Sequence, residues 1–224
     1  MIFAPVQQTG ARPCVDPTPQ PPYQIGMDTL LDASGLDLLF RQARTHNGWQ
    51  ARPVEDALLM AVYDTAKMGP TAANGNPLRI VFVKSPEAKE LLRPAVAAGN
   101  LEKTMAAPVT AIIAWDTAWF ENMPILFPAV PGMRDILAGM PPEGRERAAS
   151  QSAHLAAGYF ILAARAHGLD CGPMAGFAAD KVNAVFFPDG KWQSLFLMNM
   201  GYGDASKLYP RGPRLSFEQA CKIA

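Results

Sequence analysis

The chain has 224 residues, and its 20 basic and 20 acidic side chains give a formal net charge of zero. Hydrophobic residues make up 49% and charged residues 18% of it, which suits a globular domain and excludes a largely disordered chain. Because binding to nucleic acid relies on an excess of basic residues, this balance argues against nucleic acid as the main partner.

The N-terminal segment, residues 1–26, is rich in proline, which lacks an amide donor and keeps the preceding residue out of the helical conformation. We expect a disordered arm there or, as the alternative, a strap across a partner subunit. Residues 27–224 are expected to form a single domain.

Helical spacing of apolar residues and runs of β-branched residues then predict the first elements. Gly69-Pro70 ends the second helix and Pro86 opens the third. In chain order we expect a helix over Leu36–Arg44, a helix over Val54–Met68, a buried strand over Leu78–Val83, a helix over Glu87–Leu92 and a buried strand over Val109–Trp115.

The second half of the chain is dominated by the longest predicted helix, Glu143–His167, with Gly168 as its C-cap. Before it, Thr117–Pro142 combines aromatic residues with prolines and predicts short helices and loops that could form a lid. After it we expect a helix over Asp180–Phe186 and an apolar strand over Trp192–Met200. Few strands among many helices predict an α+β or α/β domain.

Cysteine usage and targeting signals point to the cytoplasm. Cys14, Cys171 and Cys221 are few, odd in number and far apart, so a disulfide framework is not expected. The N-terminus lacks the features of a signal peptide, and the longest apolar stretch, Leu155–Ala164, is shorter than the roughly 18 residues of a membrane helix. We expect no membrane partner.

The usual catalytic motifs are missing from this sequence. It contains no G-x-S-x-G elbow and no P-loop, and His46, His154 and His167 show no paired metal-ligand spacing. Cys171 is interpreted as a bystander in a turn rich in glycine and proline. We therefore predict neither a metal site nor a catalytic side chain.

Polar residues combine with glycine or proline in four segments, followed by a basic stretch near the C-terminus. Taken singly, each has a plain explanation as a connector or as solvated surface charge. They are Arg44–Asn47, Pro70–Pro77, Asn100–Lys103, Gly172–Phe177 and the basic Lys207–Arg214.

Together these segments resemble the nitroreductase family of FMN-dependent NAD(P)H oxidoreductases. The strings that carry the resemblance are ARTHNGW (43–49), GPTAANGNPLRIVFV (69–83), GNLEKTMAAPVTAIIAWD (99–116), GLDCGPMAGF (168–177) and GYGDASKLYPRGPRLSFEQA (201–220). Within the family they are most similar to the malonic semialdehyde reductases of pyrimidine utilisation (Rut). The resemblance implies an α/β sandwich-like fold, in which helices flank a mainly antiparallel sheet, and an intertwined homodimer with FMN at its interface.

The resemblance also implies which residues bind FMN. Arg44 and His46 match positions at the phosphate or ribityl chain, and Lys207 with Arg211, or Arg214 in another register, matches a basic pair at the phosphate. Asn100 and Lys103 match the pair beside flavin N1 and O2. A loop from the other subunit would cover the pyrimidine edge, and a turn would approach N5. The loop residues are Pro70, Thr71, Ala72 and Asn74, and the turn residues are Pro173, Met174, Ala175 and Gly176.

Some positions depart from the family pattern. Gly48, Ala72 and Ala175 stand where many members carry a basic residue, a serine and a glutamate. By the resemblance, NADH or NADPH would reduce the flavin and malonic semialdehyde would take the hydride, giving 3-hydroxypropionate. The alternatives are nitroaromatic, quinone or enone acceptors, with Trp119, Phe120 and Phe127 as pocket candidates, or a non-enzymatic flavin-binding protein.

Overall fold

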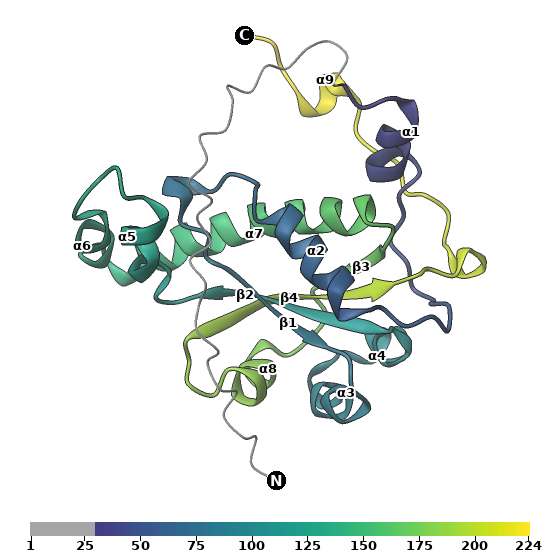
Figure 1. Cartoon of the computed structure of the whole chain (residues 1–224). Helices are drawn as coiled ribbons and strands as arrows, with labels where there is room; N and C mark the ends of the chain where they lie inside the picture. The colour runs from purple at the N-terminus through teal and green to yellow at the C-terminus, as the bar shows by residue number, and fades with distance from the viewer. Residues whose placement is uncertain (1–29) are drawn as a thin grey trace. The chain divides into compact units, whose positions relative to one another are not determined.

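The fold is built on an antiparallel sheet with the strand order β1-β2-β4-β3 (Figure 1). The computed structural model describes residues 30–224, so the predicted arm, residues 1–26, lies outside the described residues. Within them, the strands are β1 (Leu78–Val83), β2 (Val109–Asp116), β3 (Asp170–Met174) and β4 (Trp192–Gly201). The predicted strands β1, β2 and β4 are confirmed, as is the α+β class with its antiparallel sheet.

Strand β3 corrects the prediction, which placed Cys171 and the residues after it in a turn. Gly172 pairs with Asn199 and Pro173 with Met198, so this segment extends the sheet beside β4. Pro173 is tolerated because β3 is an edge strand, where a missing amide donor breaks no interior ladder. The strand was therefore predicted as a turn because glycine and proline are typical turn residues.

Helices cover both faces of the sheet (Figure 1). Helices α2 (Asp56–Ala66) and α7 (Pro142–Ala166) pack on one face, and α3 (Pro86–Leu92) and α8 (Ala179–Phe186) on the other. Side chains of β2 alternate accordingly: Val109 and Ile113 join the cluster under α7, and Ile112 joins the opposite cluster. All four helices were predicted, and each of their ends lies within two residues of the predicted bound.

The remaining helical segments are short. The predicted helix over Leu36–Arg44 is instead α1 (Ala33–Leu36) followed by a π-helical turn (Asp37–Arg41), so Arg44 lies beyond its end. Helix α4 (Ala98–Ala106) was not predicted, because Gly99 and Asn100 are weak helix formers. The expected short elements between β2 and α7 are a 3-10 turn (Trp119–Asn122), α5 (Met123–Leu126) and α6 (Met133–Ala138), and α9 (Phe217–Ala220) lies near the C-terminus.

The end of α7 directs the chain into β3. Gly168 has a φ of 79°, a left-handed conformation that glycine adopts without steric cost. The Leu169 amide donates to the Ala164 carbonyl at 2.9 Å, which confirms the predicted cap. Among the described residues, no helix is both long and apolar enough to cross a membrane.

Candidate functional site

Arg44 and His46 lie at one end of the sheet, where β3 begins and β4 ends, whereas the turn at Gly176 follows the other end of β3. Asp170 pairs with Gly201 in the sheet, and isolated bridges join Thr45 to Cys171 and Trp49 to Gly203. The segment that carries Arg44 and His46 therefore lies beside β3 and the residues after β4. Three parts of the chain that are far apart in sequence meet here.

Helix α4 contributes Lys103 to this region. Its ammonium donates a hydrogen bond to Asn47 Oδ1 at 3.1 Å, and its backbone carbonyl accepts one from Trp49 Nε1 at 3.1 Å. These contacts tie α4 to the segment after Arg44. Asn47 was not among the predicted site residues, although it directly follows His46 in the sequence.

The turn after β3 closes on the N-terminal end of α4. Asn100 Nδ2 and the Ala97 amide both donate to the Gly176 carbonyl, each at 3.1 Å. A Cβ at position 176 would lie 2.5 Å from Asn100 Nδ2, so only glycine fits this approach. Pro173 and Met174, predicted in this turn, are the last residues of β3; Pro173 and Ala175 are exposed, whereas Met174 is buried.

The imidazole of His46 points into the protein. It is 7% exposed, with Nε2 lying 3.3 Å from Asp170 Oδ1 and Nδ1 buried without a hydrogen-bond partner among the described residues. The other carboxylate oxygen of Asp170 accepts a hydrogen bond from the Gly203 amide at 2.9 Å. The His46 ring therefore packs where β3 meets the chain after β4.

A cavity of about 730 Å³ next to this region is lined by five arginines. Four of them, Arg44, Arg165, Arg211 and Arg214, donate hydrogen bonds to backbone carbonyls, and none of the described residues that line the cavity is acidic. Within residues 30–224, Arg41 is the one of the five with a carboxylate within ion-pair reach, Asp37 at 3.9 Å. Such a concentration of uncompensated guanidinium groups is suited to a phosphate. The five are Arg41, Arg44, Arg165, Arg211 and Arg214.

The arginine cavity is continuous with the region around α4, because Asn47 lines the cavity and also contacts Lys103. Arg44 donates to the Tyr209 carbonyl, which ties the C-terminal stretch to this wall. Arg165 lies near the end of α7, outside every predicted motif, and only the fold brings it here. Lys207 does not line the cavity; its aliphatic stem packs against Gly48, where a Cβ would come within 2.5 Å of it.

The predicted loop that contains Pro70, Thr71, Ala72 and Asn74 lies at the opposite end of the sheet. It precedes Leu78, which pairs with Trp115, whereas Val83 at the other end of β1 pairs with Thr110. At roughly 3.3 Å per residue, the length of β1 separates the two ends by about 17 Å. One chain therefore does not bring this loop to Lys103.

The same loop has an unusual backbone. Ala73, Asn74 and Asn76 have φ values of 49°, 52° and 41°, and alanine rarely adopts this left-handed conformation. Asn74 Nδ2 donates to the Leu126 carbonyl at 2.8 Å, and the Thr71 hydroxyl accepts from the Asn76 amide at 3.1 Å. The loop is thus held in a defined shape beside the Thr117–Pro142 segment.

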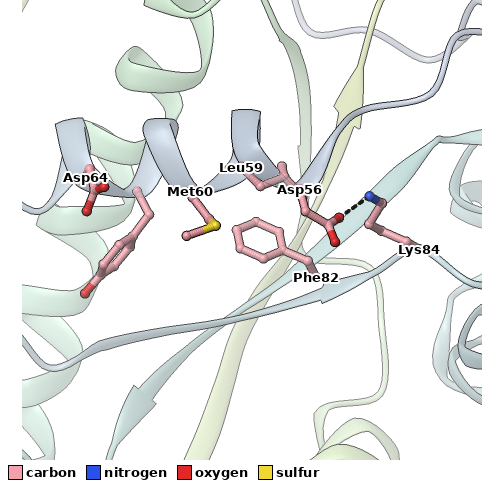
Figure 2. Close-up of a pocket in the computed structure, with 7 residues that line it drawn as sticks. Asp56, Leu59, Met60, Asp64, Phe82 and Lys84 are labelled. Carbon is pink, nitrogen blue, oxygen red and sulfur yellow. Dashed lines mark hydrogen bonds and ion pairs between the residues drawn. The ribbon is translucent and has the colours of Figure 1, made fainter. Parts of the chain in front are cut away.

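A second kind of cavity lies between α2 and β1 (Figure 2). It measures about 480 Å³, and Leu59, Met60 and Phe82 form its apolar part. An ion pair between Lys84 and Asp56 closes one end. Tyr63, predicted on the apolar face of its helix, is 45% exposed and also lines an adjoining cavity of about 500 Å³. This groove follows β1, whose residues before Val83 are only half-buried, against the predicted full burial.

Comparisons with known proteins find similar sequences and similar folds. Residues 41–202 match the family model described as the nitroreductase family. A Ralstonia nicotianae protein provisionally named an NADH dehydrogenase/NAD(P)H nitroreductase is 57% identical over 86% of this chain and 98% of its own. The fold of the present chain is similar to that of a solved Bacillus subtilis protein provisionally described as a nitroreductase, with a TM-score of 0.77 and 18% identity over 85% of this chain and 99% of the other. It is also similar to an Exiguobacterium sibiricum protein provisionally described as a nitroreductase and solved in complex with FMN, with a TM-score of 0.75 and 16% identity over 88% of this chain and 99% of the other.

Proposed function

The chain belongs to the nitroreductase family, and from this premise we propose that it is an FMN-dependent oxidoreductase that uses NADH or NADPH. The observation that carries the proposal is the continuity between the arginine cavity, Lys103 and the glycine turn at Gly176. The arginines suit the phosphate of FMN, Lys103 suits the polar edge of the flavin ring, and the turn at Gly176 permits a close approach of the backbone to the ring.

The residues present fit FMN. Arg44 and Arg211 would hold the phosphate, with Arg165 and Arg214 completing the cavity, and Lys207 would approach from the segment packed on Gly48. His46 would support the site indirectly: its ring lies against the Asp170 carboxylate, which in turn accepts a hydrogen bond from the Gly203 amide. When bound, FMN would supply the hydride chemistry at its N5 atom.

The polar residues of α4 would orient the flavin and stabilise charge. Lys103 is anchored by Asn47, so its ammonium is preorganised to stabilise the negative charge that reduction places on the flavin ring. Asn100 would hold the turn at Gly176 against α4, which keeps the backbone of Ala175 and Gly176 available to the ring. No protein nucleophile is needed for this chemistry.

This cofactor assignment has a direct test. The purified protein should be yellow and should be bleached by NADH or NADPH, and Arg44→Ala combined with Lys103→Ala should lose FMN. A colourless protein that gains no visible absorbance with FMN would refute the proposal. A yellow protein that neither nicotinamide bleaches would favour a non-enzymatic flavin-binding role.

Arg165 sharpens the test, because only the fold associates it with the phosphate. A charge-assisted hydrogen bond contributes about 1.5–3 kcal/mol, so Arg165→Gln should weaken FMN binding about tenfold or more. Riboflavin lacks the phosphate, and its binding should stay unchanged. Equal losses for FMN and riboflavin would show that Arg165 supports the fold rather than the phosphate.

We further propose that two copies complete each site, with the loop that contains Pro70, Thr71, Ala72 and Asn74 supplied by the second copy. Its position at the far end of β1 supports this, because the loop cannot reach Lys103 of its own chain. The half-buried outer edge of β1 and the apolar groove beside α2 offer a surface for a homodimer (Figure 2).

Mixing two inactive variants tests the shared site. A variant with Thr71→Ala and Asn74→Ala and a variant with Lys103→Ala should each be impaired, and heterodimers formed by refolding them together should regain one intact site per pair. Recovery toward half of the wild-type activity per heterodimer is expected. No recovery in heterodimers confirmed by mass would refute a site shared between copies.

For the acceptor we propose malonic semialdehyde, reduced to 3-hydroxypropionate in pyrimidine degradation. The long strings shared with the reductases of that pathway support this choice, which rests on resemblance rather than on geometry. The provisional name of the Ralstonia relative favours nitroaromatic acceptors as the second candidate. Steady-state rates with malonic semialdehyde and with nitrofurazone decide between them, and a higher kcat/KM for nitrofurazone would reverse the order.

A further inference from the structure

A buried lysine lies behind the candidate flavin site, in a position that none of the proposed contacts uses. Lys89 of α3 is 4% exposed, and among the described residues no carboxylate pairs with it. Its ammonium donates to the Thr104 carbonyl at 2.7 Å and to Thr110 Oγ1 at 2.6 Å. Burying an unpaired charge is costly, so a lysine that serves only as packing is poorly explained here.

The contacts of Lys89 lead directly to the residue proposed to stabilise charge. The Thr110 hydroxyl donates to Asn199 Oδ1 at 2.8 Å, and Asn199 Nδ2 donates to the Lys103 carbonyl at 3.2 Å. Thr110 and Asn199 are both fully buried. The Lys89 ammonium therefore binds the residue next to Lys103, Thr104, and a chain of three hydrogen bonds through Thr110 and Asn199 also joins it to the Lys103 carbonyl.

The same network reaches β3, the strand that leads into the turn at Gly176. Thr104 Oγ1 lies 3.4 Å from Met174 Sδ, and Asn199 pairs in the sheet with Gly172. Lys89 also binds a carbonyl in the last turn of α4, where the helix dipole favours a positive charge. One buried cation thus supports both elements that border the proposed flavin ring.

We infer that Lys89 is a positioning residue of the flavin site, which holds the C-terminal half of α4 under Lys103 and keeps a positive charge behind it at neutral pH. The inference rests on the proposed function. In an interior shielded from water, such a charge acts over a longer distance than it would at the surface. It favours the reduced flavin, which carries more negative charge than the oxidised form.

The midpoint potential of bound FMN separates this role from a merely structural one. Lys89→Met removes the charge and the hydrogen bonds, whereas Lys89→Gln removes the charge and keeps an amide donor for the Thr104 carbonyl. Both variants, saturated with FMN, are expected to have a more negative midpoint potential than the wild type. Lys89→Gln keeps the test valid if Lys89→Met does not fold.

Two controls complete the design. Lys191→Met removes an exposed lysine at the far end of β4 and should leave the potential unchanged. Thr110→Val breaks the network but keeps the charge, so it should lower stability and not the potential. A wild-type potential in FMN-bound Lys89→Gln, or an equal shift in Thr110→Val, would overturn the inference alone. A wild-type protein that binds no FMN would overturn the proposed function as well.

Discussion

Burial of Lys89 makes the stability of this protein depend on pH in a predictable direction. Loss of hydration lowers the pKa of Lys89 to about 8 from its ordinary value of 10.5. Between these pH values the unfolded chain still holds the proton that the folded chain has released. Since stability rises with pH wherever the unfolded state binds more protons, this lysine destabilises the fold below pH 8 and ceases to do so above 10.5.

The size of the effect follows from the two pKa values. At about 1.36 kcal/mol for each pKa unit, their difference corresponds to about 3 kcal/mol of unfolding free energy. Lys89→Met has no such group, so the stability of the wild type relative to this variant should rise by about 3 kcal/mol as the pH is raised from 7 to above 10.5. Titration of other groups cancels in the comparison.

Urea unfolding followed by circular dichroism measures this difference. Both proteins are unfolded at several pH values between 7 and 10.5, at one protein concentration and with the same excess of FMN. Most of the relative rise should appear above pH 8. A stability difference that stays constant across this range would mean that the Lys89 ammonium is not desolvated, and the reasoning would be refuted.

Two further predictions concern glycine and cysteine positions. Gly176→Ala should weaken FMN binding in a fluorescence titration, because its Cβ would lie 2.5 Å from Asn100 Nδ2. The control Gly99→Ala, whose Cβ would have nothing within 4 Å, should leave FMN binding unchanged. Equal FMN affinities for both variants would contradict the close approach at Gly176. Burial raises the pKa of Cys171 to about 12. Iodoacetamide at pH 8 should therefore label the exposed Cys221 in the native protein and leave Cys171 unmodified, which peptide mass spectrometry can measure. Labelling of Cys171 in the native protein would contradict its burial.

The sequence by itself determined the elements whose side chains repeat regularly and the short strings that resemble the family. The apolar run of β2 was predicted because burial on both sides leaves a continuous hydrophobic signal. Helix α7 was predicted from apolar residues at helical spacing, although only one of its faces is buried and Leu155 on the other face is 49% exposed. Helix α4 was missed because Gly99 and Asn100 are weak helix formers. Strand β3 was missed because Gly172 permits a close approach of the His46 backbone and Pro173 is tolerated only at a sheet edge, so neither residue has strand propensity.

Only the tertiary structure decided which residues meet. Arg165 lines the arginine cavity because α7 ends beside the π-helical turn, where Arg165 donates a hydrogen bond to the Leu39 carbonyl. No local sequence pattern predicts that contact. Lys89 reads as an ordinary surface lysine on a short helix until the fold buries it against Thr110. The sequence spacing also hides that β1 separates the Pro70–Pro77 loop from Lys103. Long-range contacts of this kind depend on packing, which local sequence does not record.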